Sequence, residues 1–139
     1  MTALRLIVAV ILGLLLGSLV NMALIMVGGL LITPPPGADL STAEGLRAAA
    51  PQLAPRHFLF PFLAHALGTL AGAFIAAKLA ARRKPLAALL VGGLFFIGGI
   101  LAASMIPAPA WFIALDLILA YFPCAWRGYR LAQPRRSTP

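Results

Sequence analysis

Four long apolar runs occupy most of this chain and limit what it can fold into. They cover residues 4–32, 58–80, 85–106 and 110–130. An apolar stretch of about 18 or more residues with few charges is typical of a membrane-spanning helix. The pattern therefore predicts an all-α, integral membrane four-helix bundle that is built from two hairpins and forms a single domain.

The composition supports a membrane location. The chain is 62% hydrophobic and 10% charged, whereas a soluble domain is about half apolar and about one-quarter charged. A domain of this size buries too little surface to hide so many apolar side chains from water. The single cysteine, Cys124, excludes an internal disulfide and a Cys-x-x-Cys site.

The segments between the runs carry recognisable start and stop signals. Three prolines after Thr33 end the first run, because proline removes a backbone donor and disfavours helical geometry before it. Residues 33–57 form the one long polar loop, in which Ser41 and Glu44 fit a capping box for a short helix. That helix would lie at the membrane interface, and a plain ordered loop is the alternative. A cleaved signal peptide is not expected, because the first run is too long and no Ala-x-Ala site follows it.

Lysines and arginines predict the orientation. With four spans, both termini lie on one side of the membrane, and most basic residues fall on that side: Arg5, Lys78, Arg82, Arg83, Lys84, Arg127, Arg130, Arg135 and Arg136. Only Arg47 and Arg56 fall on the other side. The positive-inside rule therefore places both termini in the cytoplasm of a bacterial cell, with the chain in the inner membrane and residues 131–139 as a cytoplasmic tail.

The net charge of +8 bears on the partners. In a soluble protein it would suggest nucleic acid, but here the basic residues flank apolar runs, so we expect no nucleic-acid partner. Anionic lipid headgroups are the expected contacts of the basic turn and tail, at Arg82, Arg83, Lys84, Arg135 and Arg136. Glycines at small-xxx-small spacing, such as Gly13 and Gly17, allow close helix packing in lipid. A homo-oligomer or a membrane-protein partner is a further expectation.

One acidic residue, Asp116, lies inside the apolar runs. A carboxylate at a helix centre costs roughly 2.5–3.5 kcal/mol on insertion scales, so it usually has a partner or a task. Helical rise places His65 and Asp116 at a similar depth in the outer half of the membrane. Thr69 shares a helical face with His65, and Asn21 lies midway along the first run. These four residues are the candidate intramembrane polar cluster.

Two interpretations of this cluster stay open. It could bind and release protons or ions, or it could hydrogen-bond between helices and fix their register. Ser104 at a similar depth would complete a Ser-His-Asp set, but three unlinked residues are weak support for catalysis. No nucleotide, zinc-protease or nucleophile-elbow motif occurs in the sequence. We therefore expect no catalytic residue, no cofactor and no metal, and an enzymatic function is not favoured.

The last run contains a further signal. Pro123 should kink its helix and free the carbonyl group of Leu119. Most of the tryptophans and tyrosines of this run match interfacial belts, and Tyr121 is the deepest of the four, which are Trp111, Tyr121, Trp126 and Tyr129.

Several stretches together resemble a group of small bacterial inner-membrane proteins of about this length that carry no assigned activity. They are Asn21–Gly29, Pro34–Asp39, His57–Leu70, Pro107–Phe112 and Leu115–Leu117. The resemblance implies a four-span bundle in the inner membrane, but no catalytic residue and no substrate.

The leading functional hypothesis is an accessory or scaffold helix bundle without enzymatic activity. The alternative is a proton- or ion-coupled small transporter or channel subunit that uses the His65–Asp116 pair. A membrane enzyme acting on a lipid or a quinone is the third and least favoured class.

Overall fold

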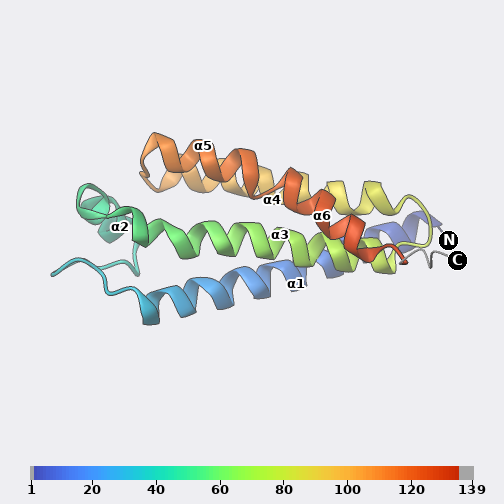
Figure 1. Ribbon diagram of the computed structural model, residues 1–139, viewed down its shortest axis with the longest axis horizontal. Helices are drawn as coiled ribbons and strands as arrows, with labels where there is room; N and C mark the ends of the chain where they lie inside the picture. Colours follow the sequence, from blue (N-terminus) through green and yellow to red (C-terminus); the bar gives the residue numbers. More distant parts are fainter. Residues whose placement is uncertain (1, 135–139) are drawn as a thin grey trace, which may run out of the picture.

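Four helical segments lie side by side in the computed structural model, which describes residues 2–134 (Figure 1). They are α1 (Thr2–Leu31), α3 (Leu59–Leu79), α4 (Lys84–Met105), and the pair α5 (Ala110–Leu119) and α6 (Phe122–Ala132). Each segment is long and apolar enough to cross a membrane. The prediction of an all-α four-helix bundle is confirmed, and the helix bounds differ from the predicted ones by only a few residues.

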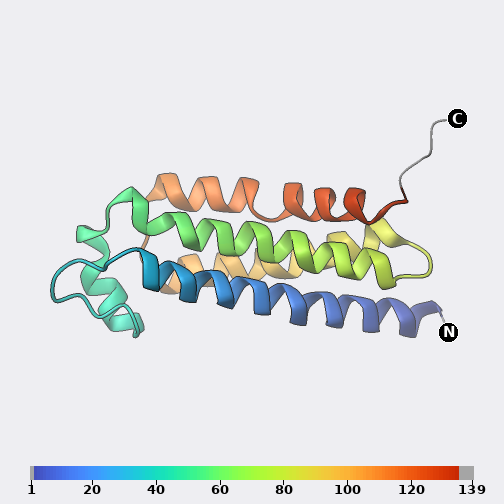
Figure 2. The ribbon, with the colours of Figure 1, turned by 60° about the horizontal axis from the view of Figure 1, so that its bottom comes forward.

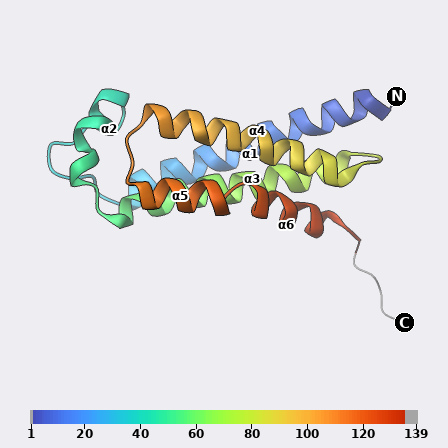
Figure 3. The same ribbon diagram turned by 90° about the horizontal axis from the view of Figure 1, so that it is seen from above.

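The two ends of the bundle differ. The start of α1, the α3–α4 turn and the end of α6 lie at one end, here called the terminal end (Figure 1). The opposite end, called the loop end, carries residues 32–58 and the short α4–α5 connection, which is clear in Figure 3. In the α3–α4 turn, Arg83 has a φ of 55° and Pro85 follows in the first turn of α4. The predicted lipid contacts Arg135 and Arg136 lie outside the described residues.

The loop end contains a short helix, α2 (Ala43–Ala49), followed by the 3-10 turns η1 (Ala50–Gln52) and η2 (Pro55–Phe58). The predicted capping box is wrong. Thr42 caps α2, since its hydroxyl accepts from the Gly45 backbone N–H at 3.0 Å. Ser41 instead donates its hydroxyl and backbone N–H to the Asp39 carboxylate, and these bonds hold the pKa of Asp39 below its usual value.

The fourth segment is broken in the middle, as the proline predicts. Helix α5 ends at Leu119 and α6 begins at Phe122 (Figure 2). Pro123 has no backbone N–H, and its ring excludes the carbonyl group four residues earlier. That carbonyl, of Leu119, accepts a hydrogen bond from the Cys124 thiol at 3.4 Å.

Small residues pack the terminal half of the bundle tightly. The buried residues there are mainly alanines: Ala9, Val10, Ala73, Ala76, Ala77, Ala80, Ala87, Ala88, Val91, Ala125 and Ala132. A Cβ added at Gly13 or Gly17 of α1 would lie 2.6 Å from a backbone carbonyl oxygen of α3. The two helices therefore touch through their backbones, as small-xxx-small packing allows. Large apolar side chains such as Leu4, Leu19 and Ile118 are exposed around the outside.

Candidate functional site

Three polar side chains meet inside the loop half of the bundle. His65 of α3 places its Nδ1 atom 2.9 Å from Oδ2 and 3.0 Å from Oδ1 of Asp116 on α5. The hydroxyl group of Tyr121, in the α5–α6 break, donates to Asp116 Oδ2 at 2.9 Å. The same hydroxyl lies 3.1 Å from His65 Nδ1. Asp116 is only 4% exposed, so these contacts take the place of solvent around the carboxylate.

The contact with Asp116 bears on which ring nitrogen of His65 carries a hydrogen. With Asp116 ionised, its oxygens only accept hydrogen bonds, so the Nδ1 atom of His65 carries the hydrogen that lies between them. The other ring nitrogen, Nε2, then accepts in the neutral imidazole and donates in the protonated one. His65 also lines the cavity described below, so Nε2 is the ring atom left for an incoming group.

Two features of the backbone admit Tyr121. The helix break turns its side chain inward, where it is 2% exposed and packs edge-on against Phe96. On α4, Gly99 leaves the space that the Tyr121 hydroxyl fills, since a Cβ at that glycine would collide with the phenol. The neighbouring Gly98 has open space around it.

Two of the four residues in the predicted polar cluster contact each other in the structure, and the other two do not bond to them. His65 and Asp116 are in contact, whereas Asn21 and Thr69 hydrogen-bond to neither of them within residues 2–134. Ser104 is exposed and donates to the Leu101 carbonyl oxygen at 2.7 Å, so the Ser-His-Asp set does not form.

The cluster predicted from the sequence does not include Tyr121. Its expected place in an interfacial belt is wrong, because it is buried against Asp116. The sequence did contain a signal, since Pro123 predicts irregular backbone just before it. A polar residue in such a break can point into the bundle rather than out of it.

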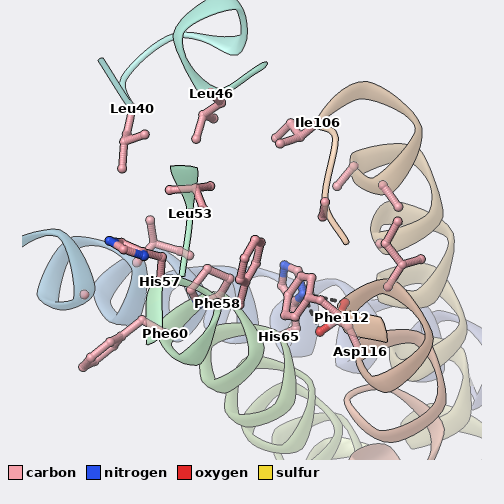
Figure 4. Close-up of a pocket in the computed structure, with 18 of the residues that line it drawn as sticks. Leu40, Leu46, Leu53, His57, Phe58, Phe60, His65, Ile106, Phe112 and Asp116 are labelled. Carbon is pink, nitrogen blue, oxygen red and sulfur yellow. Dashed lines mark hydrogen bonds and ion pairs between the residues drawn. The ribbon is translucent and has the colours of Figure 1, made fainter. Parts of the chain in front are cut away.

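An apolar cavity of about 430 Å³ occupies the loop half beside this cluster (Figure 4). Leu40, Leu46 and Leu53 of the loop close it on one side, and His65 and Asp116 form part of the opposite wall. Its remaining walls come from all four segments and include Ile25, Gly28, Phe58, Phe60, Ala102, Ala103, Ile106 and Phe112.

Hydrogen bonds fix the loop over this first cavity. Arg47 of α2 donates from Nε to the carbonyl oxygen of Met105 at the end of α4, at 3.1 Å. The ring nitrogens of His57 lie 3.0 Å (Nδ1) and 3.3 Å (Nε2) from the carbonyl oxygens of Ala54 and Thr33, and each nitrogen that carries a hydrogen donates to its carbonyl. His57 therefore holds the loop together and takes no part in the polar cluster.

A second cavity of about 320 Å³ adjoins the first, and both are lined by His65 and Gly99. It lies between α1 and α4, with Ser18, Asn21, Thr69 and Tyr121 among its lining residues. Thr69 is 1% exposed, and its hydroxyl has no hydrogen-bond partner among the described residues.

Comparisons with known proteins identify no relative for this chain. No protein-family model, no curated protein and no solved structure matches this chain. Within residues 2–134, no group of three His, Cys, Asp or Glu residues could hold a metal ion.

Proposed function

We propose that this chain is a small multi-pass protein of the bacterial inner membrane that binds an amphipathic molecule in the outer half of its bundle. The observation that carries the proposal is the first cavity, which is about 430 Å³ in volume, mostly apolar, and walled in part by His65 and Asp116. Sites for small molecules typically measure ≈300–1,000 Å³ and combine apolar walls with a few convergent polar groups.

The basic residues support the orientation in this proposal. Arg82, Arg83 and Lys84 lie at the terminal end, in the α3–α4 turn, and Arg127 and Arg130 lie on α6 near the same end. By the positive-inside rule the terminal end faces the cytoplasm. The loop end, with the first cavity, then lies in the outer leaflet.

A binding function accounts for more of the structure than a scaffold does. Several of the glycines that favour an accessory or scaffold role are covered by the chain's own helices, as at Gly13 and Gly17, although Gly98 has open space around it. A bundle built only to scaffold gains nothing from a hollow of this size, because atoms lining a void lose packing contacts.

Proton-coupled transport is the second candidate, favoured by the position of His65 between the two cavities. The tightly packed terminal half would have to open in a second state. Proton or solute flux into proteoliposomes should then fall in an Asp116→Asn variant. Unchanged flux would remove Asp116 from any transport mechanism.

Tryptophan fluorescence tests the proposed binding. The two tryptophans report on different places: Trp111 packs edge-on against Phe58, a lining residue of the first cavity, at 5.7 Å between ring centroids, whereas Trp126 lies on α6. Both tryptophans are about half exposed, at 49% for Trp111 and 46% for Trp126. A Trp126→Phe variant therefore reports on the cavity through the saturable part of its quenching, and a Trp111→Phe variant reports on the surrounding lipid alone.

The probes are bromine-bearing alkyl compounds of one chain length with an alcohol, carboxylate or quaternary ammonium head, added to protein in nanodiscs. At least one probe should quench Trp111 saturably, while Trp126 is quenched only in proportion to partitioning into lipid. Filling the cavity with Ala103→Phe should remove the saturable part, whereas Leu101→Phe on the exposed face of α4 should not. Unsaturable quenching of both tryptophans by all three probes would contradict the proposal.

A further inference from the structure

The two adjoining cavities differ in chemistry. The first is lined mainly by aliphatic and aromatic side chains. The second carries hydroxyl, amide and imidazole groups, from Ser18, Asn21, Thr69, His65 and Tyr121. A molecule that extends along both cavities past His65 would therefore have an apolar body in the first cavity and a polar head in the second.

Unused hydrogen-bonding groups mark the second cavity as a place for a head group. The buried Thr69 hydroxyl has no hydrogen-bond partner among the described residues, and an unsatisfied buried polar group costs about 1–3 kcal/mol. Asn21 also lines this cavity, and its amide makes no hydrogen bond within the described part of the chain. His65 lines both cavities, and its Nε2 atom makes no hydrogen bond within residues 2–134. These groups offer both donors and acceptors to one head.

Charge limits what that head can be. Among residues 2–134, neither cavity is lined by a lysine or an arginine. A carboxylate or phosphate head would therefore meet Asp116 with only the histidines His57 and His65 as basic lining residues, which is costly in a low-dielectric site. A cationic head would find the Asp116 oxygens already bonded to His65 and Tyr121.

We infer that the site takes an amphipathic molecule with an uncharged head, a hydroxyl or a carbonyl group, held by Thr69, Asn21 and His65. The alkyl body lies in the first cavity, under the leucines of the loop. This inference rests on the proposed binding function and specifies the chemical class of its ligand. A free long-chain alcohol and a neutral glycerolipid share this chemistry. Dialysis against vesicles without neutral lipid removes both from the protein, and adding back one of them at a time shows which one binds.

The three brominated probes test the head group directly, because their chains are the same. The alcohol should quench Trp111 at about tenfold lower concentration than the carboxylate or the ammonium compound, the equivalent of ~1.4 kcal/mol. Equal or tighter binding of the carboxylate would overturn the inference and leave the proposed binding function intact. Absence of saturable quenching by every probe would instead remove the proposed function itself.

Substitutions at the head-binding groups provide a second measurement. Thr69→Val keeps the shape of the side chain and removes the unpartnered hydroxyl, so the free protein should not lose stability. Binding of the alcohol should weaken about three- to tenfold in Thr69→Val and in Asn21→Leu, as expected for ~1 kcal/mol per hydrogen bond. A brominated alkane without a head should bind these variants and the wild type equally.

Ser104→Ala is the matched control, because that hydroxyl is exposed and lies outside both cavities. It should leave the affinity for the alcohol unchanged. Unaltered alcohol binding in both Thr69→Val and Asn21→Leu would show that the head does not reach the second cavity, and would contradict the inference.

Discussion

At the scale of single residues, the Asp116 carboxylate is stabilised inside the apolar bundle because two side-chain donors bond to it. His65 Nδ1 and the Tyr121 hydroxyl both lie 2.9 Å from its Oδ2 atom. Hydrogen bonds to an ionised acceptor are about twice as strong as neutral ones. The contacts that stabilise the charge also orient His65, because they commit Nδ1 and leave Nε2 for a ligand.

A double-mutant cycle should detect this coupling. His65→Phe and Asp116→Leu each remove one partner, and their combined effect on the free energy of unfolding should differ from the sum by about 1–2 kcal/mol, within the range for residues in direct contact. Equilibrium unfolding in mixed micelles measures it. His57→Phe paired with Asp116→Leu is the control and should be additive within ~0.5 kcal/mol, because His57 bonds only to loop carbonyls. Equal coupling for both histidines would contradict the assigned pair.

An added methyl group should lower the stability of the protein at Gly99 but not at the neighbouring Gly98. Gly99→Ala would push the Tyr121 phenol out of place and should destabilise the fold by about 1–3 kcal/mol, as for other overpacked sites. Gly98→Ala meets open space and should be neutral or stabilising by up to ~1 kcal/mol, since alanine favours helix more than glycine. Thermal unfolding compares the two variants, and similar melting temperatures would argue against the placement of Tyr121.

The sequence predicts the site incompletely for a physical reason. Helical rise alone brings His65 and Asp116 to one depth, so their pairing could be foreseen. Tyr121 could not, because its direction depends on how the backbone leaves helical geometry before Pro123. The cap of α2 shows the same limit: Ser41 and Thr42 are both good caps, and the bond from Ser41 to Asp39 decides between them.

At the scale of elements, α3 is the helix around which the bundle is arranged, with α1, α4 and α6 all packed against it. Its contact with α1 is close in the terminal half, whereas α1 and α4 are separated by cavities farther toward the loop end. Hydrophobic runs predicted all four segments, since length and hydropathy depend only on local sequence. The two cavities of the loop half could not be predicted, because they depend on where the helices diverge from one another.

The close contact of α1 with α3 predicts unequal effects of two substitutions on one helix. Gly17→Ala would place a methyl group 2.6 Å from the carbonyl oxygen of Gly68 and 2.8 Å from the Phe95 ring, so the helices must separate. We expect a loss of about 1–3 kcal/mol in the free energy of unfolding. Gly29→Ala, with nothing within 4 Å of the added carbon, should be nearly neutral. Equal losses would contradict backbone contact at Gly17.

At the scale of the whole molecule, the bundle has a dense terminal half and a hollow loop half. Cysteine labelling tests the orientation that puts the hollow in the outer leaflet. In a Cys124→Ser background, a membrane-impermeant maleimide should label a Gln52→Cys variant in intact cells and an Arg82→Cys variant only after lysis. The reverse pattern would place the cavity on the cytoplasmic side.

Native mass spectrometry of the protein released from its own membrane shows whether the outer half of the bundle holds a lipid. The wild type and Leu101→Phe should retain an adduct with the mass of a lipid that has an uncharged head, and Ala103→Phe should lose it because the new ring fills the cavity. A bare chain in all three proteins, or an adduct that persists in Ala103→Phe, would contradict a binding site in the outer half of the bundle.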